Sequence, residues 1–352
     1  MSRPCAGSRR VAGRQQGYIL ALNLAVLALM LLGASFVGQR VFDAVRLAKA
    51  EQHSVDVAIE LESARARLLM LLATTPRSAK GLGTLQASVS LDGRDYRLTD
   101  TVLVSLQDVR GLVSLNGTSL SGVGRERIER LLGTWGVSDV KAVALTDALL
   151  DYRDADDLRR LNGAEANDYR AKGGETELRN GDLLAATELQ RVFGWRDTPE
   201  LWGSDPITDH VSTQRGAAFN PNAATWRALV AMAGIDAVTA KALVVSRLQD
   251  QTADISSLLF GAGVGDPFGA NSFVMPFPGP TLLVTLRSAK APWGYRMVVT
   301  HTPGENTSPW RIGAVWRVAM ALPTQAMAEI PVLPQAAALR DPNATGQLEF
   351  PF

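Results

Sequence analysis

The apolar run from Tyr18 to Val37 constrains the fold of this chain more than any other feature. Its only clearly polar residues are Asn23 and Ser35. A helix of about 20 residues, rising 1.5 Å per residue, is about 30 Å long, which matches the hydrocarbon thickness of a bilayer. The sequence therefore predicts one membrane-spanning helix, over residues 18–38.

The charges before this run predict its orientation. Residues 1–17 form a basic leader without any acid, and the first carboxylate of the chain is Asp43. Because cations hold their flank of a membrane helix in the cytoplasm, we expect the bulk of the chain on the far side of the membrane. The cations of the leader are Arg3, Arg9, Arg10 and Arg14.

Three kinds of N-terminal signal fit these residues. A cleaved secretory signal would use Gly33-Ala34-Ser35 as its small-residue exit, whereas a signal anchor would stay uncleaved. The third possibility starts from Gly17, which ends the leader, and the aromatic Tyr18 that follows it. This pair resembles the class III signal of type IV pilins and pseudopilins, in which a prepilin peptidase cuts after the glycine and leaves the apolar helix in place. The N-terminal residues alone leave all three open.

The helical pattern continues beyond the membrane. Residues 39–73 contain neither proline nor glycine, and apolar residues recur close to helical spacing while charges occupy the intervening faces. Thr74-Thr75-Pro76 ends the pattern. We interpret it as one helix, first surrounded by lipid and then amphipathic against a domain. A membrane anchor followed by a separate helix is the alternative.

Two segments alternate with the period of a strand. Residues 84–91 and 94–104 flank Asp92-Gly93, a strong hairpin signal. After residue 270, strands are predicted over 281–286, 295–300 and 311–319. One antiparallel sheet formed by both segments, packed on the N-terminal helix, is the economical arrangement.

The region between these strands, roughly 112–262, is mostly helical in pattern. It includes a predicted helix over residues 185–194 that ends at Gly194, and two more around Gly234. The fold class is therefore α+β, with a long N-terminal helix, a small antiparallel sheet and a large all-α insertion. The predicted divisions are the leader 1–17, the membrane half-helix 18–38, the first part of the sheet domain 39–111, the insertion 112–265, the completing strands 266–320 and a Pro/Ala-rich tail 321–352.

Composition narrows the classes of function. The chain has 352 residues, of which 46% are hydrophobic and 20% charged, as expected of a folded protein. A formal net charge of +1 offers no electrostatic footprint for nucleic acid. The only cysteine, Cys5, lies in the leader. A chain without its leader therefore has neither a disulfide scaffold nor a thiol nucleophile.

An acidic cluster follows one of the predicted helices. Asp151, Asp154, Asp156 and Glu165 could hold a hard cation through carboxylate oxygens, as calcium sites do. The spacing is not that of an EF-hand, because Leu158 and Arg159 stand where an oxygen ligand and a glycine are needed. The alternative is a solvated helix end whose acids pair with the arginines of the same segment: Arg153, Arg159 and Arg160.

The sequence gives weaker support for histidine-based sites, for DNA binding and for hydrolysis. His53, His210 and His301 are isolated in sequence, which favours surface or capped histidines over a metal site or a catalytic pair. Residues 121–132 and 233–247 each resemble half of a helix-hairpin-helix, a unit that holds DNA phosphates in many proteins. An anchored periplasmic DNA-binding protein is therefore one alternative function, although the neutral charge favours simple packing. A metal-dependent hydrolase built on the acidic cluster is a third.

One family resemblance joins these features. It is carried by Asn116, residues 149–157, Asn162-Gly163-Ala164-Glu165, Tyr169 and residues 188–194. The residues that carry it resemble minor pseudopilin K of type II secretion systems (general secretion pathway protein K), a family with the pattern L-x-D-W-x-D-x-D-D, N-G-x-E and a tyrosine. Tyr152 replaces the tryptophan here, and residues 220–225 rearrange a later N-x-N-T-A segment, so the chain resembles a divergent member.

The resemblance implies a structural, non-enzymatic role. Such a protein is a single-pass inner-membrane protein, mostly periplasmic, which caps the pseudopilus together with minor pseudopilins I and J and other pseudopilins after cleavage by the prepilin peptidase. The pseudopilus helps to export folded proteins, and no nucleic acid is expected as a partner. The resemblance also implies calcium at the four matching acids.

Leu22 would be the fifth residue of a chain cut after Gly17. Other pilins typically carry glutamate there, which pairs with the N-terminal amine of a neighbouring subunit in lipid, where an unpaired charge is costly. Its absence suits a subunit at the tip.

Overall fold

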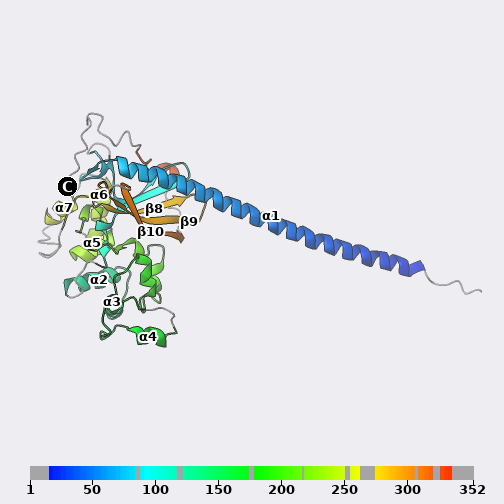
Figure 1. Ribbon diagram of the computed structural model, residues 1–352, viewed down its shortest axis with the longest axis horizontal. Coiled ribbons are helices and arrows are strands. Elements are labelled where there is room, and N and C mark those ends of the chain that lie inside the picture. Colours follow the sequence, from blue (N-terminus) through cyan, green and yellow to red (C-terminus); the bar gives the residue numbers. More distant parts are fainter. Residues whose placement is uncertain are drawn as a thin grey trace, which may run out of the picture. The chain divides into compact units, whose positions relative to one another are not determined.

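The computed structural model describes residues 16–84, 88–116, 122–173, 178–215, 218–249, 254–261, 274–305, 308–319 and 326–334 (Figure 1). The chain divides into two compact units, Met1–Ile59 and Glu60–Phe352.

A single helix, α1, runs without interruption from Gln16 to Thr74, which confirms the predicted continuous helix (Figure 1). It ends two residues before Pro76, as expected because proline cannot continue the hydrogen-bond ladder. In the first unit its apolar side chains are exposed, Leu20 by 65% and Leu31 by 70%. Among the described residues, α1 is the only helix long and apolar enough to cross a membrane.

The end of α1 belongs to the second unit and is anchored there by one carboxylate. Leu61 and Leu68 are fully buried. Glu60 accepts hydrogen bonds from the hydroxyls of Thr101 and Ser288 and from Nζ of Lys290. Burial alone would raise the pKa of Glu60, but these donors lower it overall. The helix end is therefore held to the sheet by polar contacts as well as by apolar packing.

The sheet has five antiparallel strands in the order β10-β9-β8-β5-β4. The predicted joint sheet is thus confirmed, because strands from both alternating segments pair directly through β5 and β8. Every residue of β5 is buried, whereas those of the edge strand β10 alternate between half-buried and exposed. The strands are β4 (Asp92–Arg97), β5 (Val102–Asp108), β8 (Thr281–Ser288), β9 (Trp293–His301) and β10 (Trp310–Ala319).

The predicted position of the first hairpin turn is wrong. Asp92 and Gly93 begin strand β4 instead of forming a turn. The chain reverses after Arg97, where the hydroxyl of Thr99 accepts hydrogen bonds from the backbone N–H groups of Thr101 and Val102 at 3.3 and 3.0 Å. A side-chain-to-backbone turn of this kind replaces the Asp-Gly turn.

A tertiary contact explains why Asp92 is not in the turn. Its carboxylate pairs with Arg94 at 2.7 Å and with Arg247, from the distant helix α6, at 3.3 Å. Gly93 has φ +79° at a bulge in the β4–β5 ladder. Of the strand predicted over 84–91, the structure shows β3 (Ser88–Val89), paired with β2 (Gly81–Gly83), which in turn pairs with β1 (Arg77–Ser78); residues 85–87 lie outside the described residues.

The segment between β5 and β8 is mostly helical, as predicted, and has its own core around Trp195 and Tyr152. It is not purely α, because β6 (Val113–Ser114) and β7 (Val211–Ser212) form a short parallel pair. Its α-helices are α2 (Val123–Gly133), α3 (Asp139–Arg153), α4 (Ala166–Ala171), α5 (Trp226–Ala233), α6 (Ala237–Gln249) and α7 (Ile255–Gly261).

Two local predictions in this segment have different outcomes. Gly234 lies between α5 and α6 with φ +68°, a left-handed cap that ends α5, as the sequence predicts. The helix predicted over residues 185–194 is instead a 3₁₀ helix over Ala186–Arg191. The borders at 112 and 265 remain predictions, and residues 262–273 lie outside the described residues.

One buried carboxylate connects the sheet to this helical segment. Asp108, at the end of β5, is completely buried. It accepts hydrogen bonds from Nδ2 of Asn220 at 2.9 Å, from the N–H of Gly279 at 3.0 Å and from the N–H of Arg110 at 3.0 Å. Three parts of the chain that are far apart in sequence thus meet at one side chain.

Candidate metal centre

The acidic cluster lies where α3 ends and α4 begins. Asp151 is in the last turn of α3, Asp154 caps its C-terminus, and Glu165 is the residue before α4. The connecting loop contains Asp156. Asp151 is fully buried and Glu165 is 7% exposed, whereas Asp156 is exposed.

Arg160 provides the cation of this loop. Its Nη1 lies 2.5 Å from Oδ1 of Asp151 and 2.5 Å from Oδ2 of Asp154. Its backbone N–H donates to Oδ2 of Asp151 at 3.1 Å. Burial raises the pKa of Asp151, and the neighbouring Asp154 raises it too, although Arg160 opposes both effects. The predicted pairing of these acids with an arginine of the same segment is therefore confirmed for Arg160.

The Asn-Gly pair of the loop has a steric and a polar role. Gly163 passes so close to Asp151 that a β-carbon there would overlap the carboxylate. Asn162 donates from its side chain to Oδ2 of Asp147 at 3.2 Å. Asp147 is in turn paired with Arg125 of α2 at 2.5 Å. The loop is thus held against α3 by the close approach of Gly163 and by the hydrogen bond of Asn162.

Glu165 differs from the other buried acids. The Glu165 side chain faces the N–H of Asp168 as in a capping box, but neither of its buried oxygens makes a hydrogen bond of normal geometry among the described residues. The same holds for Oδ1 of Asp154. Burial, together with the charges of Asp151 and Asp154, raises the pKa of Glu165 to about 7. A buried carboxylate without donors is costly, which marks this position as one where a cation would be stabilising.

The four predicted ligands are not equally placed. Asp151 and Asp154 both accept a hydrogen bond from Nη1 of Arg160, and the charges of both raise the pKa of Glu165. Asp156 faces outward, and its Oδ1 accepts a hydrogen bond from the N–H of Leu158 at 2.8 Å. In the part of the chain that the structure describes, no three acidic or histidine side chains converge as a ready-made metal site. The side chains nevertheless offer only hard oxygen atoms. Three of these atoms, both carboxylate oxygens of Glu165 and Oδ1 of Asp154, make no hydrogen bond of normal geometry among the described residues. Oxygens of this kind fit a hard cation such as calcium.

The tyrosines of the same motif form its support. Tyr152 and Tyr169 are buried with ring centroids 6.3 Å apart. The hydroxyl of Tyr169 accepts a hydrogen bond from the N–H of Phe193 at 2.8 Å. Asn116 acts similarly, because its Nδ2 donates to the carbonyl of Leu183 and its Oδ1 accepts from the N–H of the same residue. These residues hold the loop and the core around it.

The N-terminal residues that the sequence singles out lie at the start of α1. Gly17 lies in its first turn, Tyr18 is 75% exposed and Leu22 is 51% exposed. All three precede the residues that the second unit contains.

His210 is not the isolated histidine that the sequence suggests. It is buried, with Nε2 2.6 Å from Oδ1 of Asp205 and Nδ1 2.9 Å from the hydroxyl of Thr225. This order of acid, histidine and hydroxyl resembles a hydrolytic triad, but Thr225 is the N-cap of α5 and accepts from the N–H of Ala228. The group is a structural cap, which agrees with the capped histidine that the sequence favours, although the spacing in sequence did not identify its partners.

Arg125 and Arg130, two of the cations of α2, are engaged within the protein. Arg125 pairs with Glu129 and Asp147, and Arg130 donates to the carbonyl of Ala231 at 2.9 Å. Gly122, before the helix, has φ +61°, and the buried face of α2 packs in the core. This arrangement favours packing over phosphate binding for residues 121–132.

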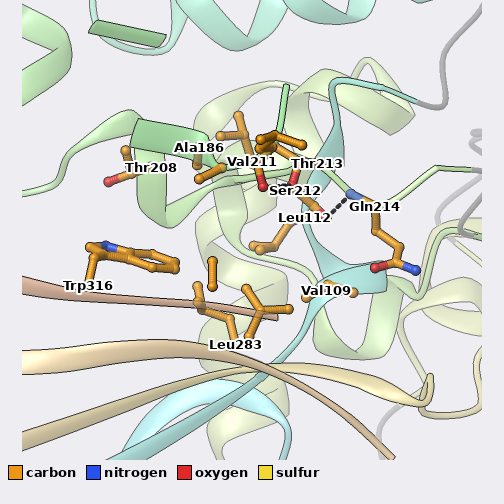
Figure 2. Close-up of a pocket in the computed structure, with 14 residues that line it drawn as sticks. Val109, Leu112, Ala186, Thr208, Val211, Ser212, Thr213, Gln214, Leu283 and Trp316 are labelled. Atoms are coloured by element: carbon orange, nitrogen blue, oxygen red, sulfur yellow. Dashed lines mark hydrogen bonds between the residues drawn. The ribbon is translucent and has the colours of Figure 1, made fainter. Parts of the chain in front are cut away.

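A separate cleft lies between the sheet and the helical segment (Figure 2). Leu283 and Trp316 approach it from the strands, while Val211 and Thr208 lie opposite. Among the described residues that line it, none is acidic, basic or histidine. The cleft therefore lacks the groups that acid–base chemistry requires.

Comparisons with known proteins find one family-model match and a similar fold among solved structures. Residues 106–201 match the family model described as type II secretion system (T2SS), protein K. Among solved structures, a chain from "The Crystal Structure of the GspK-GspI-GspJ complex from enterotoxigenic Escherichia coli Type 2 Secretion System" is similar, with a TM-score of 0.51 and 15% identity over 79% of this chain and 99% of that chain. Comparison with curated proteins finds no match.

Proposed function

We infer that this chain, which its residues 106–201 identify as a type II secretion system protein K, forms the tip of the pseudopilus. The family predicted from the sequence is confirmed, and with it a component of the pseudopilus. The finer role that we propose is structural rather than catalytic. The subunit assembles with minor pseudopilins I and J and assists the export of folded proteins across the outer membrane.

The observation that best supports the role is the joint presence of two features in one chain. The helical segment carries the protein K match, and the apolar, exposed first part of α1 fits a single-pass inner-membrane anchor. The bulk of the chain is then periplasmic. Co-purification from membranes with minor pseudopilins I and J of the same secretion system tests the assembly. Recovery of the chain without either partner under mild detergent would contradict it.

We further propose that a prepilin peptidase cuts between Gly17 and Tyr18. The unbroken helix supports this position, because cleavage after Ser35 would cut through α1, which continues from Gln16 to Thr74, and would remove nearly all of the apolar run. Mass analysis of the N-terminus of the membrane-bound protein should give a mature start at Tyr18. A start near Phe36 would identify an ordinary secretory signal instead.

Leu22 supports the tip position. A subunit without glutamate at this place offers no charged partner to the N-terminal amine of a neighbour in lipid. Cross-linking of cysteine pairs engineered between α1 helices should place the chain at one end of each pseudopilus. Cross-links to pseudopilins on both sides along the filament axis would exclude a tip subunit.

For the acidic loop we propose a structural calcium site formed by Asp151, Asp154 and Glu165, with Asp156 at its rim. The unpartnered oxygens of Glu165 and Asp154 support it. Calcium would supply positive charge to a buried group of acids and fix the loop between α3 and α4. Adding calcium to chelator-treated protein should raise its Tm, and Glu165→Gln should abolish that rise. Glu200→Gln is a matched control, because Glu200 lies on the surface, where it pairs with Lys141 at 3.8 Å.

A further inference from the structure

Arg160 occupies the middle of the acidic loop in a manner that the proposed calcium site does not explain. One nitrogen, Nη1, lies 2.5 Å from an oxygen of each of two carboxylates, Asp151 and Asp154. A guanidinium that bridges two acids through one nitrogen takes the place that a small cation would take between them. Its side chain is 35% exposed, so a path to solvent is open to it.

The oxygens of the loop divide into two sets around this side chain. Arg160 engages both oxygens of Asp151 and one of Asp154, through its side chain and its backbone N–H. The other oxygen of Asp154 and both oxygens of Glu165 have no partner among the described residues. Glu165 is 93% buried, since 7% of it is exposed, and so its unpartnered carboxylate is independent support for a ligand here.

We propose that Arg160 is a built-in competitor for the cation. In the metal-free protein its guanidinium neutralises Asp151 and Asp154, which keeps the loop folded. A divalent cation that binds Asp154 and Glu165 and recruits Asp151 must displace the guanidinium toward solvent. The affinity of the site is therefore set by the loss of the Arg160 contacts as well as by the carboxylates. This inference rests on the proposed calcium site.

The loop contains its own control. Arg159 is adjacent and carries the same charge, but it is 57% exposed and pairs with Asp168 at 3.2 Å, outside the bridged pair. Arg159→Gln therefore removes the same net charge from the loop without removing the bridge. Any effect of long-range charge on calcium binding should be shared by the two variants, and any effect of competition should belong to Arg160→Gln alone.

The test is a calcium titration of the full-length protein in detergent, in which isothermal titration calorimetry measures the binding. We expect Arg160→Gln to bind calcium about tenfold more tightly than the wild type, since charge-assisted hydrogen bonds no longer have to be broken. Arg159→Gln should change the affinity by less than about threefold, as expected of an exposed charge. Binding by Arg160→Gln when the wild type shows none would support the proposal equally.

A second measurement separates competition from damage to the fold. Without calcium, Arg160→Gln should have a lower Tm than the wild type, and saturating calcium should remove the difference. Equal or weaker calcium affinity of Arg160→Gln would overturn the proposal, as would the absence of binding in every variant. Neither result would affect the tip assignment, which the N-terminal and co-purification experiments test separately.

Discussion

Two buried carboxylates in this protein have opposite surroundings. Asp108 is completely buried and accepts three hydrogen bonds, whereas Glu165 is nearly as buried and accepts none of normal geometry from the described residues. A buried charge is tolerated when donors replace the lost water, and it is destabilising when they do not. The comparison teaches that burial alone does not identify a functional acid. The absence of internal donors distinguishes Glu165, at the candidate site, from Asp108, which has a structural role.

The largest effect is expected at the satisfied carboxylate. Asp108→Ala leaves the N–H groups of Arg110 and Gly279 and the amide of Asn220 without an acceptor. We expect a loss of about 3 kcal/mol or more in the free energy of unfolding. Urea denaturation followed by tryptophan fluorescence measures it. Asp100→Ala, at an exposed turn, is the control and should stay within about 0.5 kcal/mol of the wild type. Equal effects at both positions would show that Asp108 has no special structural role.

The second-largest loss of stability is expected at Gly163, where the loop packs closely against α3. Gly163→Ala places a methyl group against the carboxylate of Asp151 and should cost about 2 kcal/mol, with weaker calcium binding. Gly133→Ala is the matched control, since Gly133 ends α2 with open space around it. Alanine favours helix there and should be neutral or stabilising by up to about 1 kcal/mol. Thermal unfolding with and without calcium compares the two, and a neutral Gly163→Ala would show that the loop is loose.

The unsatisfied carboxylate should respond in the opposite direction to Asp108. Removing its charge by Glu165→Gln should leave the metal-free protein at neutral pH as stable as the wild type or more stable, by up to about 1–2 kcal/mol. Denaturation in the presence of a chelator measures the change. A clear loss of stability would mean that Glu165 has donors after all, and the contrast with Asp108 would disappear.

The smallest effect concerns Asp205, a carboxylate that has partners but is 47% exposed. Its pKa is lowered to about 2: burial would raise it, but His210 and Arg227 lower it more. The ordinary value is 3.8, so its contribution to stability is present above about pH 4 and is lost as the pH falls from there to about 2. Asp205→Asn should flatten this part of the stability curve slightly, and an unchanged curve would contradict the assignment.

Much of the fold follows from the sequence because its signals are local. The absence of proline and glycine over residues 39–73 predicts the continuous α1, and Gly234 marks the end of α5. The hairpin failed because its determinant is distant: Arg247 of α6 pairs with Asp92, and this contact outweighs the turn preference of Asp-Gly. Local preference is a weak guide where a buried ion pair competes with it.

The candidate site is predictable in composition and not in arrangement. Spacing identifies Asp151, Asp154 and Glu165, and the loop glycine follows from the family pattern. Spacing cannot show that Asp156 turns outward to bind the N–H of Leu158, or that Arg160 rather than Arg159 enters the cluster. Those outcomes depend on backbone directions set by α3 and α4. The polar chain through His210 was missed for the same reason.

The hydrogen bonds that Asp108 accepts have a consequence for the order of folding. Its partners Asn220 and Gly279 lie 112 and 171 residues further along the chain. A chain made from its N-terminus at about 5–20 residues per second exposes Asp108 many seconds before Gly279 exists. The central strand β5 must therefore wait, with an unpaired carboxylate at its end, for the last third of the polypeptide. Folding of the second unit should be late and slow, as contacts between distant segments require.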